Sequence, residues 1–403
     1  MTAAGDRRFA HGPAWPAMVL TAGLGTRLRP LSLLCAKPAL PVAGVPLVGR
    51  ILRWLSGSGV RSTVLNLHHL PATVTAAVGD GTGFGVEVRY SWERTILGSA
   101  GGPARALQLV DANQFFVVNG DTLTDVSLAA LAADHQQSGA QVTLALVPNP
   151  DPLHYGGVTV DGDGRVTGFT PRGPANTGLH FIGVQAVDAE VFAPLDPDVP
   201  AETIDGIYHD MIARRPGCVR AFVSGASFRD IGTAADYLDT CLDLARIEQV
   251  GDGLFGRGVA VGDDLIRRGV TAGDGLLGRG VAVGDDLLPG GVTAGDGLFG
   301  RGVTVADDLL PGGVTAGDGL FGRGVTVADG ARITNCVLWD DVRVGRGVTL
   351  DRSVIAGGVS IPDGARYERS ILRRLDGPPA EAGERVVGDL LVSRIDGFGQ
   401  RAR

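Results

Sequence analysis

The sequence predicts an α/β domain with a mainly parallel sheet, followed by a solenoid of short strands. From about residue 17 to residue 245, short apolar runs alternate with longer mixed segments, as in repeated βα units. Beyond Val250 the composition changes abruptly to Gly, Val, Asp and Leu with a regular spacing. A chain of 403 residues is long enough for two or three domains with substantial cores.

The first part of the chain contains apolar runs that are expected to form strands and amphipathic runs that are expected to form helices. Thr233 is the expected N-cap of the last helix, Asp236 stands in its first turn, and the helix is expected to close the first domain. The expected strands are 17–21, 63–67, 115–118, 142–147 and the 181–184 region; the expected helices are 47–57, 102–109, 128–139 and 234–249. The apolar face of the last helix comprises Tyr237, Leu238, Cys241, Leu242 and Ala245.

The second part is an internal repeat. A Val that follows a Gly recurs every eleven residues, and a Leu stands six residues after most of these Val residues. The Val positions are Val259, Val270, Val281, Val292, Val303, Val314 and Val325, after which the steps become six, six and five. One apolar residue every five or six positions predicts a solenoid with one inward side chain per short strand. Two alternatives stay open: a recently expanded low-complexity segment that folds poorly, and a calcium-binding β-roll, although the nonapeptide spacing of the latter is absent.

The charge balance excludes several classes of partner. A net charge of −8 and a pI near 5.4 argue against nucleic acid and against a membrane surface. No apolar run reaches the ~18 residues that span a bilayer, and residues 1–15 lack the apolar core of a signal peptide. We therefore expect a cytoplasmic protein, with its four scattered cysteines reduced.

The first apolar run leads into a Gly-rich turn that suits a polyphosphate. Gly23 and Gly25 allow close approach of the backbone to a ligand, while Thr26, Arg27 and Lys37 supply donors and positive charge. The turn differs from two common phosphate loops. Leu28 stands where the dinucleotide fingerprint needs a third Gly, and no Gly-Lys-Ser/Thr comes after it as in a Walker loop.

The segment from Ala22 to Leu47, with Gly-Leu-Gly-Thr-Arg-Leu-Arg-Pro and then Lys37-Pro38, resembles the signature of the sugar-1-phosphate nucleotidylyltransferases. Ser32 replaces the usual Thr and keeps the hydroxyl. Leu97-Gly98-Ser99-Ala100-Gly101 is similar to the family's base-and-ribose loop, in the form found in mannose-1-phosphate guanylyltransferase-like members. The resemblance implies that Arg27 and Lys37 act on the triphosphate and the transferring phosphoryl group. It implies nucleotide contacts from Ala22, Gly23, Gly25, Thr26, Gly98, Ser99 and Gly120.

The same resemblance implies a magnesium site. Asn119-Gly120-Asp121 ends an apolar strand, and Phe228-Arg229-Asp230-Ile231-Gly232-Thr233 is similar to the family's Trp-x-Asp-Ile-Gly-Thr motif. The acids of these motifs chelate Mg²⁺ in the family, which assigns Asp121 and Asp230 as ligands and makes Asp121 catalytic. Mg²⁺ typically takes only one or two protein carboxylates beside substrate oxygens.

The sugar-phosphate side departs from the family pattern. Tyr155-Gly156-Gly157-Val158 and Asn176-Thr177-Gly178 resemble its sugar-contacting motifs, implying contacts from Tyr155, Gly156, Asn176 and Thr177. Between them, Pro171 and Arg172 stand where the family has Glu and Lys. Arg172 retains a charge for the sugar phosphate with a changed geometry, whereas Pro171 cannot accept a hydrogen bond from sugar hydroxyls.

The expected protein is an enzyme of EC 2.7.7 type that uses an NTP and a sugar 1-phosphate, with GTP and mannose 1-phosphate or a related heptose phosphate preferred. UTP or dTTP with glucose 1-phosphate is the enzymatic alternative, and a catalytically weak, regulatory nucleotide-sugar-binding paralogue is the other. The expected parts are an N-terminal extension (1–15), a Rossmann-like nucleotidyltransferase domain (16–250), repeats (251–374) and a tail that leaves the solenoid (375–403).

The repeats resemble the left-handed parallel β-helix of several such enzymes, through which a homo-oligomer could assemble. In a three-sided solenoid, the four strands of each 22-residue unit would make one and a third turns, so that deletion of one unit would rotate the chain from Ala331 onward by about a third of a turn. An acyltransferase role is rejected because all seven His residues precede the repeats.

Overall fold

The computed structural model describes residues 15–252 and 319–395, together with the backbone of six short strands between them. Most of the expected N-terminal extension, much of the repeat region and residues 396–403 lie outside the described residues. The chain divides into two compact units that interleave in sequence. The first comprises Met1–Leu24, Ala36–Ala39 and Pro46–Asp230, and the second comprises Gly25–Cys35, Leu40–Val45 and Ile231–Arg403.

The first unit is built on a mixed sheet of seven strands with the order β12-β8-β11-β6-β1-β4-β5. Only β11 is antiparallel to its neighbours β6 and β8, so the sheet is mainly parallel, as predicted. The strands are β1 (Ala17–Leu20), β4 (Ser62–Leu67), β5 (Glu87–Trp92), β6 (Gln114–Asn119), β8 (Val142–Val147), β11 (His180–Asp188) and β12 (Val219–Val223). Two small pairs accompany it: β7 (Thr122–Thr124) with β13 (Phe228–Asp230), and β9 (Gly157–Val160) with β10 (Val166–Thr170).

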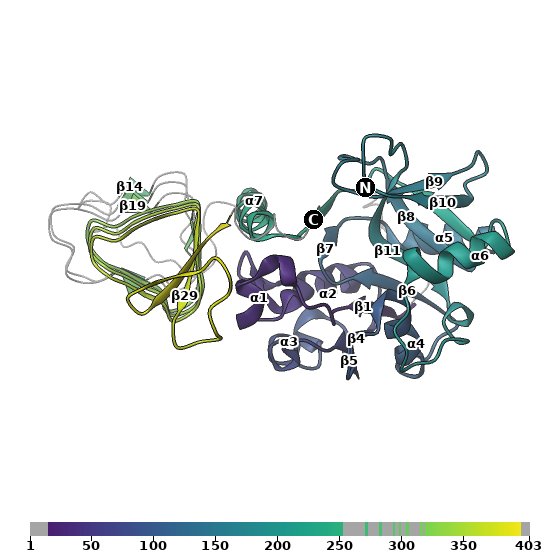
Figure 1. Ribbon diagram of the computed structural model, residues 1–403, viewed down its shortest axis with the longest axis horizontal. Helices are drawn as coiled ribbons and strands as arrows, with labels where there is room; N and C mark the ends of the chain where they lie inside the picture. Colours follow the sequence, from purple (N-terminus) through teal and green to yellow (C-terminus); the bar gives the residue numbers. More distant parts are fainter. Residues whose placement is uncertain are drawn as a thin grey trace, which may run out of the picture. The chain divides into compact units, whose positions relative to one another are not determined.

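Helices pack against this sheet (Figure 1). Helix α4 contacts β1, β4 and β5, and α5 contacts β8 and β11. Ser127 caps α5 by accepting a hydrogen bond from the amide of Ala130 at 3.2 Å. The helices are α2 (Leu47–Gly57), α3 (Pro71–Val78), α4 (Gly98–Val110), α5 (Leu128–Ser138) and α6 (Tyr208–Arg214).

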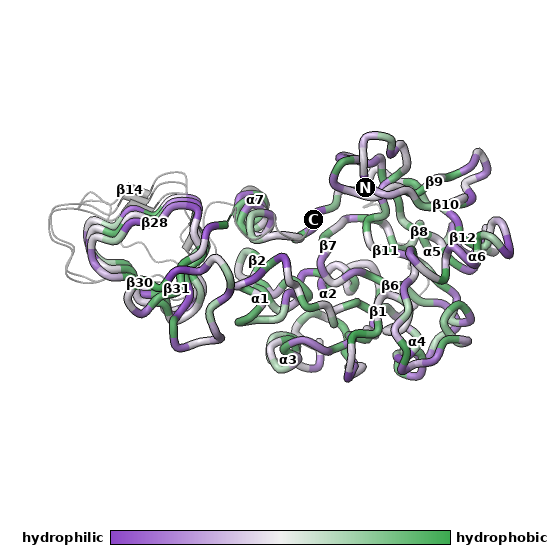
Figure 2. Tube along the Cα trace, viewed as in Figure 1, coloured by the Kyte–Doolittle hydropathy of each residue, from purple (hydrophilic) through white to green (hydrophobic). Residues whose placement is uncertain are grey.

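Apolar runs explain where the central strands form. All six residues of β8 are buried, and the strands β1, β4 and β6 are buried along most of their length. Figure 2 shows the hydrophobic residues concentrated along the strands of the sheet, with hydrophilic residues in the connecting segments. The five predicted strands and four predicted helices are therefore confirmed, although α4 begins four residues earlier than expected.

The second unit contains a solenoid with three parallel sheets, which form the three sides of a triangular coil (Figure 1). Val337 pairs with Val354, which pairs with Ile371, so a turn in this part takes seventeen residues. The first sheet holds β14 (Thr271–Ala272), β16 (Thr293–Ala294), β19 (Thr315–Ala316), β22 (Arg332–Thr334), β25 (Thr349–Asp351) and β28 (Arg366–Glu368). The second holds β15 (Ala282–Val283), β18 (Thr304–Val305), β21 (Thr326–Val327), β24 (Arg343–Val344) and β27 (Ser360–Ile361). The third holds β17 (Leu298–Phe299), β20 (Gly319–Phe321), β23 (Cys336–Leu338), β26 (Val354–Ile355) and β29 (Ser370–Arg374).

The strand register corrects the predicted geometry of the 22-residue units. Thr271 pairs with Thr293, and Thr293 pairs with Thr315, so each step to the next turn takes twenty-two residues. One unit therefore makes one complete turn, and the expected one and a third turns is wrong. The extra length lies in one connection: nine residues separate β18 from β19, but only four separate β21 from β22. The spacing of Val and Leu residues alone could not show that the four apolar positions of one unit belong to a single turn.

The expectation that the chain leaves the solenoid at Leu375 is also wrong. Strand β31 (Leu390–Arg394) pairs antiparallel with β29, and β30 (Arg385–Val387) pairs with β31. The side chains of Arg373 and Glu384 are fully buried and form an ion pair, and Arg373 also donates to the carbonyl oxygens of Pro378 and Pro379. This hairpin ends the solenoid in an antiparallel strand pair, which completes the last sheet.

Helix α7 (Ala234–Asp252) belongs to the second compact unit, whereas the sequence places the end of the first domain near Val250. Its N-cap is confirmed, because the Thr233 hydroxyl accepts from the Asp236 amide at 3.2 Å and the Asp236 carboxylate accepts from the Thr233 amide at 2.7 Å. Buried Tyr237 donates to the carbonyl of Pro41 at 2.6 Å and accepts from the indole of Trp339 at 3.0 Å. The predicted apolar face of α7 is therefore buried in this unit.

Candidate nucleotide site

The carboxyl ends of β1 and β6 form the edge on which the candidate site lies. The two strands are parallel neighbours, and Leu20 pairs with Asn119 at their last positions. Gly120 comes directly after, and a Cβ atom there would clash with the carbonyl oxygen of Leu20. Only glycine permits this approach, which brings Asp121 to the end of β1.

A cleft of about 240 Å³ opens at this edge. Seven of the predicted site residues line it: Ala22, Gly23, Lys37, Gly98, Ser99, Gly120 and Asp121. A Cβ at Gly23 would meet no atom within 4 Å, so the backbone of the turn faces open space. The Lys37 Nζ lies 2.8 Å from the Asp121 Oδ2, and the Lys37 side chain is only 12 % exposed. Two sequence motifs that lie 84 residues apart thus meet in one ion pair.

Lys37 is the only lysine of the chain, and every other basic residue in the Lys and Arg total is an arginine. Every other Lys or Arg position of the chain is therefore occupied by arginine. A lysine differs from arginine in presenting a compact, strongly hydrated point charge instead of a planar fork. The single lysine stands in the cleft, so its place in the composition was a further signal in the sequence.

A buried polar network that lines part of the cleft was not predicted. Asn66, near the end of β4, accepts from the Thr21 amide at 2.6 Å and donates to Glu93 at 2.7 Å. Glu93 is fully buried and also accepts from the Leu97 amide at 3.0 Å. The network ties the ends of β1, β4 and β5 to the start of α4. A polar residue at the carboxyl end of an apolar strand, as in Thr-Val-Leu-Asn-Leu, was the available signal.

The Gly98-Ser99 turn is held by a second segment that was not predicted. The Ser99 hydroxyl donates to Glu202 at 2.6 Å and accepts from the Thr203 amide at 2.8 Å. Gly98 has a φ of 76°, and a Cβ there would lie very close to a Glu202 carboxylate oxygen. The turn at the start of α4 is therefore fixed in shape before any ligand binds.

The structure places Asp230 in β13 and Asp121 immediately before β7, the strand that pairs with β13. Asp230 pairs in register with Thr122, the residue next to Asp121 in the chain. Mg²⁺ needs only one or two carboxylates beside substrate oxygens, so Asp121 and Asp230 are the candidate ligands. Among the residues that the structure describes, no group of three or more His, Cys, Asp or Glu side chains is arranged to hold a metal.

The predicted residues Gly25, Thr26 and Arg27 belong to the second compact unit. Gly25 has a φ of 61° and leads into a 3₁₀ turn, Thr26–Leu28, in which Thr26 and Arg27 are exposed. The Ser32 hydroxyl donates to the carbonyl of Gly25 at 2.8 Å, so the hydroxyl kept at this position stabilises the turn. Further along, Arg29 forms an ion pair of 3.1 Å with Glu381.

A second cavity of about 560 Å³ in the first unit contains part of the predicted sugar-phosphate side. Gly156, Pro171, His180, Asp205 and His209 are among the residues that line it. The predicted Tyr155 stacks against His180, with ring centroids 4.3 Å apart. Burial lowers the pKa of His180 to about 4, so this ring is neutral near pH 7.

The other three predicted sugar-phosphate residues lie in the adjoining loops. Asn176 is 5 % exposed and donates to the Tyr155 carbonyl at 2.9 Å, while its own oxygen accepts from the Gly178 amide at 3.0 Å. These bonds give Asn176 a clear part in shaping the loop. Arg172 and Thr177 are exposed.

Comparison with known proteins places the chain in a family. The model of the nucleotidyl transferase family matches residues 16–246, which is more than half of the chain. The chain therefore belongs to the nucleotidyl transferase family. The model of the GlmU-like C-terminal hexapeptide domain matches residues 301–367 in the solenoid.

Several curated proteins are similar to the first part of the chain. A mannose-1-phosphate guanylyltransferase of Mycobacterium tuberculosis is 32 % identical over 236 residues, which are 57 % of this chain and 64 % of that protein. An N-acetylmuramate alpha-1-phosphate uridylyltransferase of Neisseria meningitidis is 38 % identical over 179 residues, which are 44 % of this chain and 76 % of that protein. The match thus spans less than two thirds of the guanylyltransferase.

Among solved structures, HddC from Yersinia pseudotuberculosis complexed with GMP-PN aligns with a TM-score of 0.50 and 25 % identity, covering 57 % of this chain and 99 % of that one. No helix among the described residues is both long enough and apolar enough to cross a lipid bilayer.

Proposed function

We propose that this chain transfers a nucleotidyl group from an NTP to a sugar 1-phosphate. An oxygen of the sugar phosphate attacks the α-phosphorus of the NTP, the bond from that phosphorus to the β-phosphate oxygen breaks, and pyrophosphate leaves. The products are an NDP-sugar and pyrophosphate. The observation that carries the proposal is the pairing of the only lysine with Asp121 in a glycine-lined cleft at the carboxyl edge of the sheet.

The ion pair suggests how the two side chains act. Lys37 and Asp121 are each other's partners at 2.8 Å. A triphosphate oxygen would replace Asp121 as the partner of Lys37, which leaves the carboxylate available as a metal ligand beside Asp230. Mg²⁺ held there would supply positive charge against the phosphates. The ammonium of Lys37 would gain interaction energy as negative charge grows in the transition state.

The nucleotide would lie along the rigid edge of the cleft. The backbone of Ala22 and Gly23 faces the open space, and the Gly98-Ser99 turn is preformed by Glu202. Thr26 and Arg27 would contribute donors to the triphosphate from the turn after Gly25. On the other side, Tyr155, Gly156, Arg172, Asn176 and Thr177 would contact the sugar phosphate.

We propose GTP with mannose 1-phosphate, or a related heptose phosphate, as the substrate pair. The similarity to two proteins named as mannose-1-phosphate guanylyl- or guanyltransferases supports this choice. UTP with a sugar 1-phosphate is the second candidate, because two other relatives are named as uridylyltransferases. We further propose that the solenoid is left-handed and supports a homo-oligomer, and that the protein works in the cytoplasm.

Pyrophosphate release from a panel of NTPs and sugar 1-phosphates tests the proposal. Turnover should require an NTP, a sugar 1-phosphate and Mg²⁺ together, and should be highest with GTP. If turnover were highest with UTP, the preferred base would be uracil and not guanine. Tight binding of an NDP-sugar without turnover for any pair would instead support the regulatory alternative.

A further inference from the structure

The three corners of the solenoid differ in the residues that adopt left-handed backbone conformations. The corner between the second and first sheets carries Gly330, Gly347 and Gly364, with φ of 69°, 62° and 70°. The corner between the third and second sheets carries Gly324, Asp341 and Gly358, with φ of 67°, 62° and 69°. The corner between the first and third sheets carries Asn335, Arg352 and Arg369, with φ of 50°, 45° and 46°.

Arginine at such a corner needs an explanation. A Cβ atom clashes with the backbone in the left-handed region, which favours glycine and, after it, asparagine or aspartate. The other two corners have this preference in the described turns, and so does Asn335. Arg352 and Arg369 do not, although each stands one turn beyond the corner residue before it. The backbone conformation does not favour arginine, so it does not explain why these two side chains stand at this corner.

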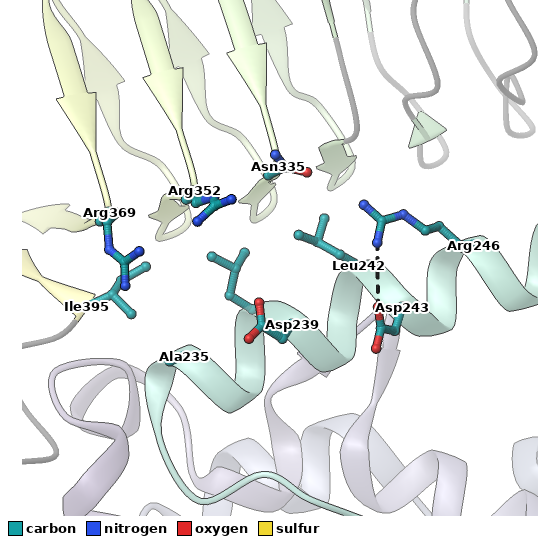
Figure 3. A pocket seen from close by; sticks show the side chains of 10 residues that line it. Ala235, Asp239, Leu242, Asp243, Arg246, Asn335, Arg352, Arg369 and Ile395 are labelled. Atoms are coloured by element: carbon teal, nitrogen blue, oxygen red, sulfur yellow. Dashed lines mark ion pairs between the residues drawn. The ribbon is translucent and has the colours of Figure 1, made fainter.

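The arginine corner faces a cavity. Asn335, Arg352 and Arg369 line a space of about 420 Å³ between the solenoid and α7, both in the second unit. Figure 3 shows the three side chains on one side and α7 on the other. A volume of this size is in the range of about 300–1,000 Å³ that small-molecule sites occupy.

The helix side supplies groups of a different kind. Leu238 and Leu242 present an apolar surface, and Asp239 offers an exposed carboxylate. Asp243 is paired with Arg246 of the same helix at 3.5 Å (Figure 3). Arg352 forms no ion pair with any residue in the described part of the chain, so the helix does not account for its charge.

This combination matches one class of ligand. Guanidinium groups bind phosphate oxygens through paired, fork-shaped hydrogen bonds. A carboxylate and an amide, as in Asp239 and Asn335, accept hydrogen bonds from hydroxyl groups. We propose that this cavity binds a small phosphorylated polyol, with the phosphate on Arg352 and Arg369 and the hydroxyl groups toward Asp239 and Asn335. The site is separate from the cleft of Lys37, and the proposal does not depend on the transfer reaction.

Substitution by asparagine gives a matched test, because Asn335 shows that asparagine fits this corner. The double variant Arg352→Asn and Arg369→Asn should keep its melting temperature but lose the charge. Calorimetric titration with glucose 6-phosphate should show binding to the full chain, weakened at least about tenfold in the double variant. Arg332→Asn, an exposed arginine of β22 outside the cavity, is the control and should bind as the unchanged chain does.

Two further titrations distinguish this site from the cleft of Lys37 and from a general phosphate site. Lys37→Ala should keep the affinity for glucose 6-phosphate, because Lys37 lies in the other unit. Inorganic phosphate should bind more weakly than glucose 6-phosphate, because it lacks hydroxyl groups on a carbon frame. Absence of binding to the unchanged chain, equal affinity in the double variant, loss of binding in Lys37→Ala, or equal affinity for the two probes would overturn the proposal.

Discussion

Lys37 is the one basic Lys or Arg position of the chain that is a lysine and not an arginine. We expect Lys37→Ala to lower kcat/KM by about a hundredfold or more, the scale of losing one transition-state donor. Lys37→Arg keeps the charge but changes its geometry, so most of this loss should remain. Steady-state kinetics measure both Lys37 variants. Arg61→Lys, the reverse substitution at an exposed position, is the control. Near-unchanged kinetics in Lys37→Arg would show that any cation suffices there.

Asp121 gives a second prediction at the residue scale. Asp121→Asn should nearly abolish Mg²⁺-dependent turnover, because the loss of a metal ligand removes several kcal/mol of charge stabilisation. The melting temperature should change little, because asparagine keeps the size of the side chain and a carbonyl oxygen that accepts from Lys37. Asp163→Asn, which removes a surface ion pair with Arg165, is the matched control. An Asp121→Asn enzyme that turns over normally would contradict the metal assignment.

His180 should make stability depend on pH. Burial, and to a lesser degree the charge of His154, lower its pKa from the ordinary 6.5 to about 4. In the unfolded chain His180 binds a proton below pH 6.5, whereas in the folded protein it does so only near pH 4. Stability should therefore fall as the pH falls from 6.5 to 4. Denaturant unfolding should show a shallower fall in His180→Phe, and parallel curves for the two proteins would contradict the assignment.

At the scale of elements, the register of the solenoid predicts which deletions it tolerates. Removal of residues 278–299 takes out one unit of twenty-two residues and one complete turn, so the later strands should keep their sheets. Removal of 278–288 leaves the eleven-residue Val spacing intact but removes only half of that turn. Thermal unfolding should show the longer deletion to be the better tolerated. The reverse order would contradict a turn of twenty-two residues.

The hairpin after β29 depends on one buried ion pair. Glu384→Ala should destabilise the solenoid by about 3–5 kcal/mol, because Arg373 would remain buried without its counter-charge. Arg374→Ala, in the neighbouring exposed pair with Asp376, should cost far less, because exposed ion pairs contribute little to stability. Urea unfolding followed by the fluorescence of Trp339 compares the two. Similar losses in both variants would show that the burial of the pair is unimportant.

Elements with strong apolar patterns could be predicted, and those without could not. The strand at 142–147 and the helix at 47–57 agree with the structure to the residue. The short strands β7 and β13 carry no pattern of their own, since they exist through their pairing with each other. The buried pair of Arg373 and Glu384 could not be predicted either, because charged residues in a sequence ordinarily indicate a surface.

At the scale of the whole molecule, the sequence motifs predicted which residues share a site better than they predicted where the chain divides. Lys37 and Asp121, which belong to two motifs 84 residues apart, form one ion pair in the cleft. The two compact units interleave, because Gly25–Cys35 and Leu40–Val45 belong with the solenoid. An analysis of the sequence in order assigns each continuous stretch to one domain. It could not predict that two short segments near the N-terminus belong to the second unit. Asn66 and Glu93, which line the cleft, and Glu202, which holds the Gly98-Ser99 turn, were missed because no motif in the sequence marks them.

The central claim is that a sugar-phosphate oxygen attacks the α-phosphorus of an NTP. The most direct test uses a sugar 1-phosphate whose non-bridging phosphate oxygens carry ¹⁸O, incubated with GTP, Mg²⁺ and the full chain. Mass spectrometry of the products should find all of the label in the NDP-sugar and none in the pyrophosphate. Label in the released pyrophosphate, or NDP-sugar that has lost it, would contradict the proposed reaction.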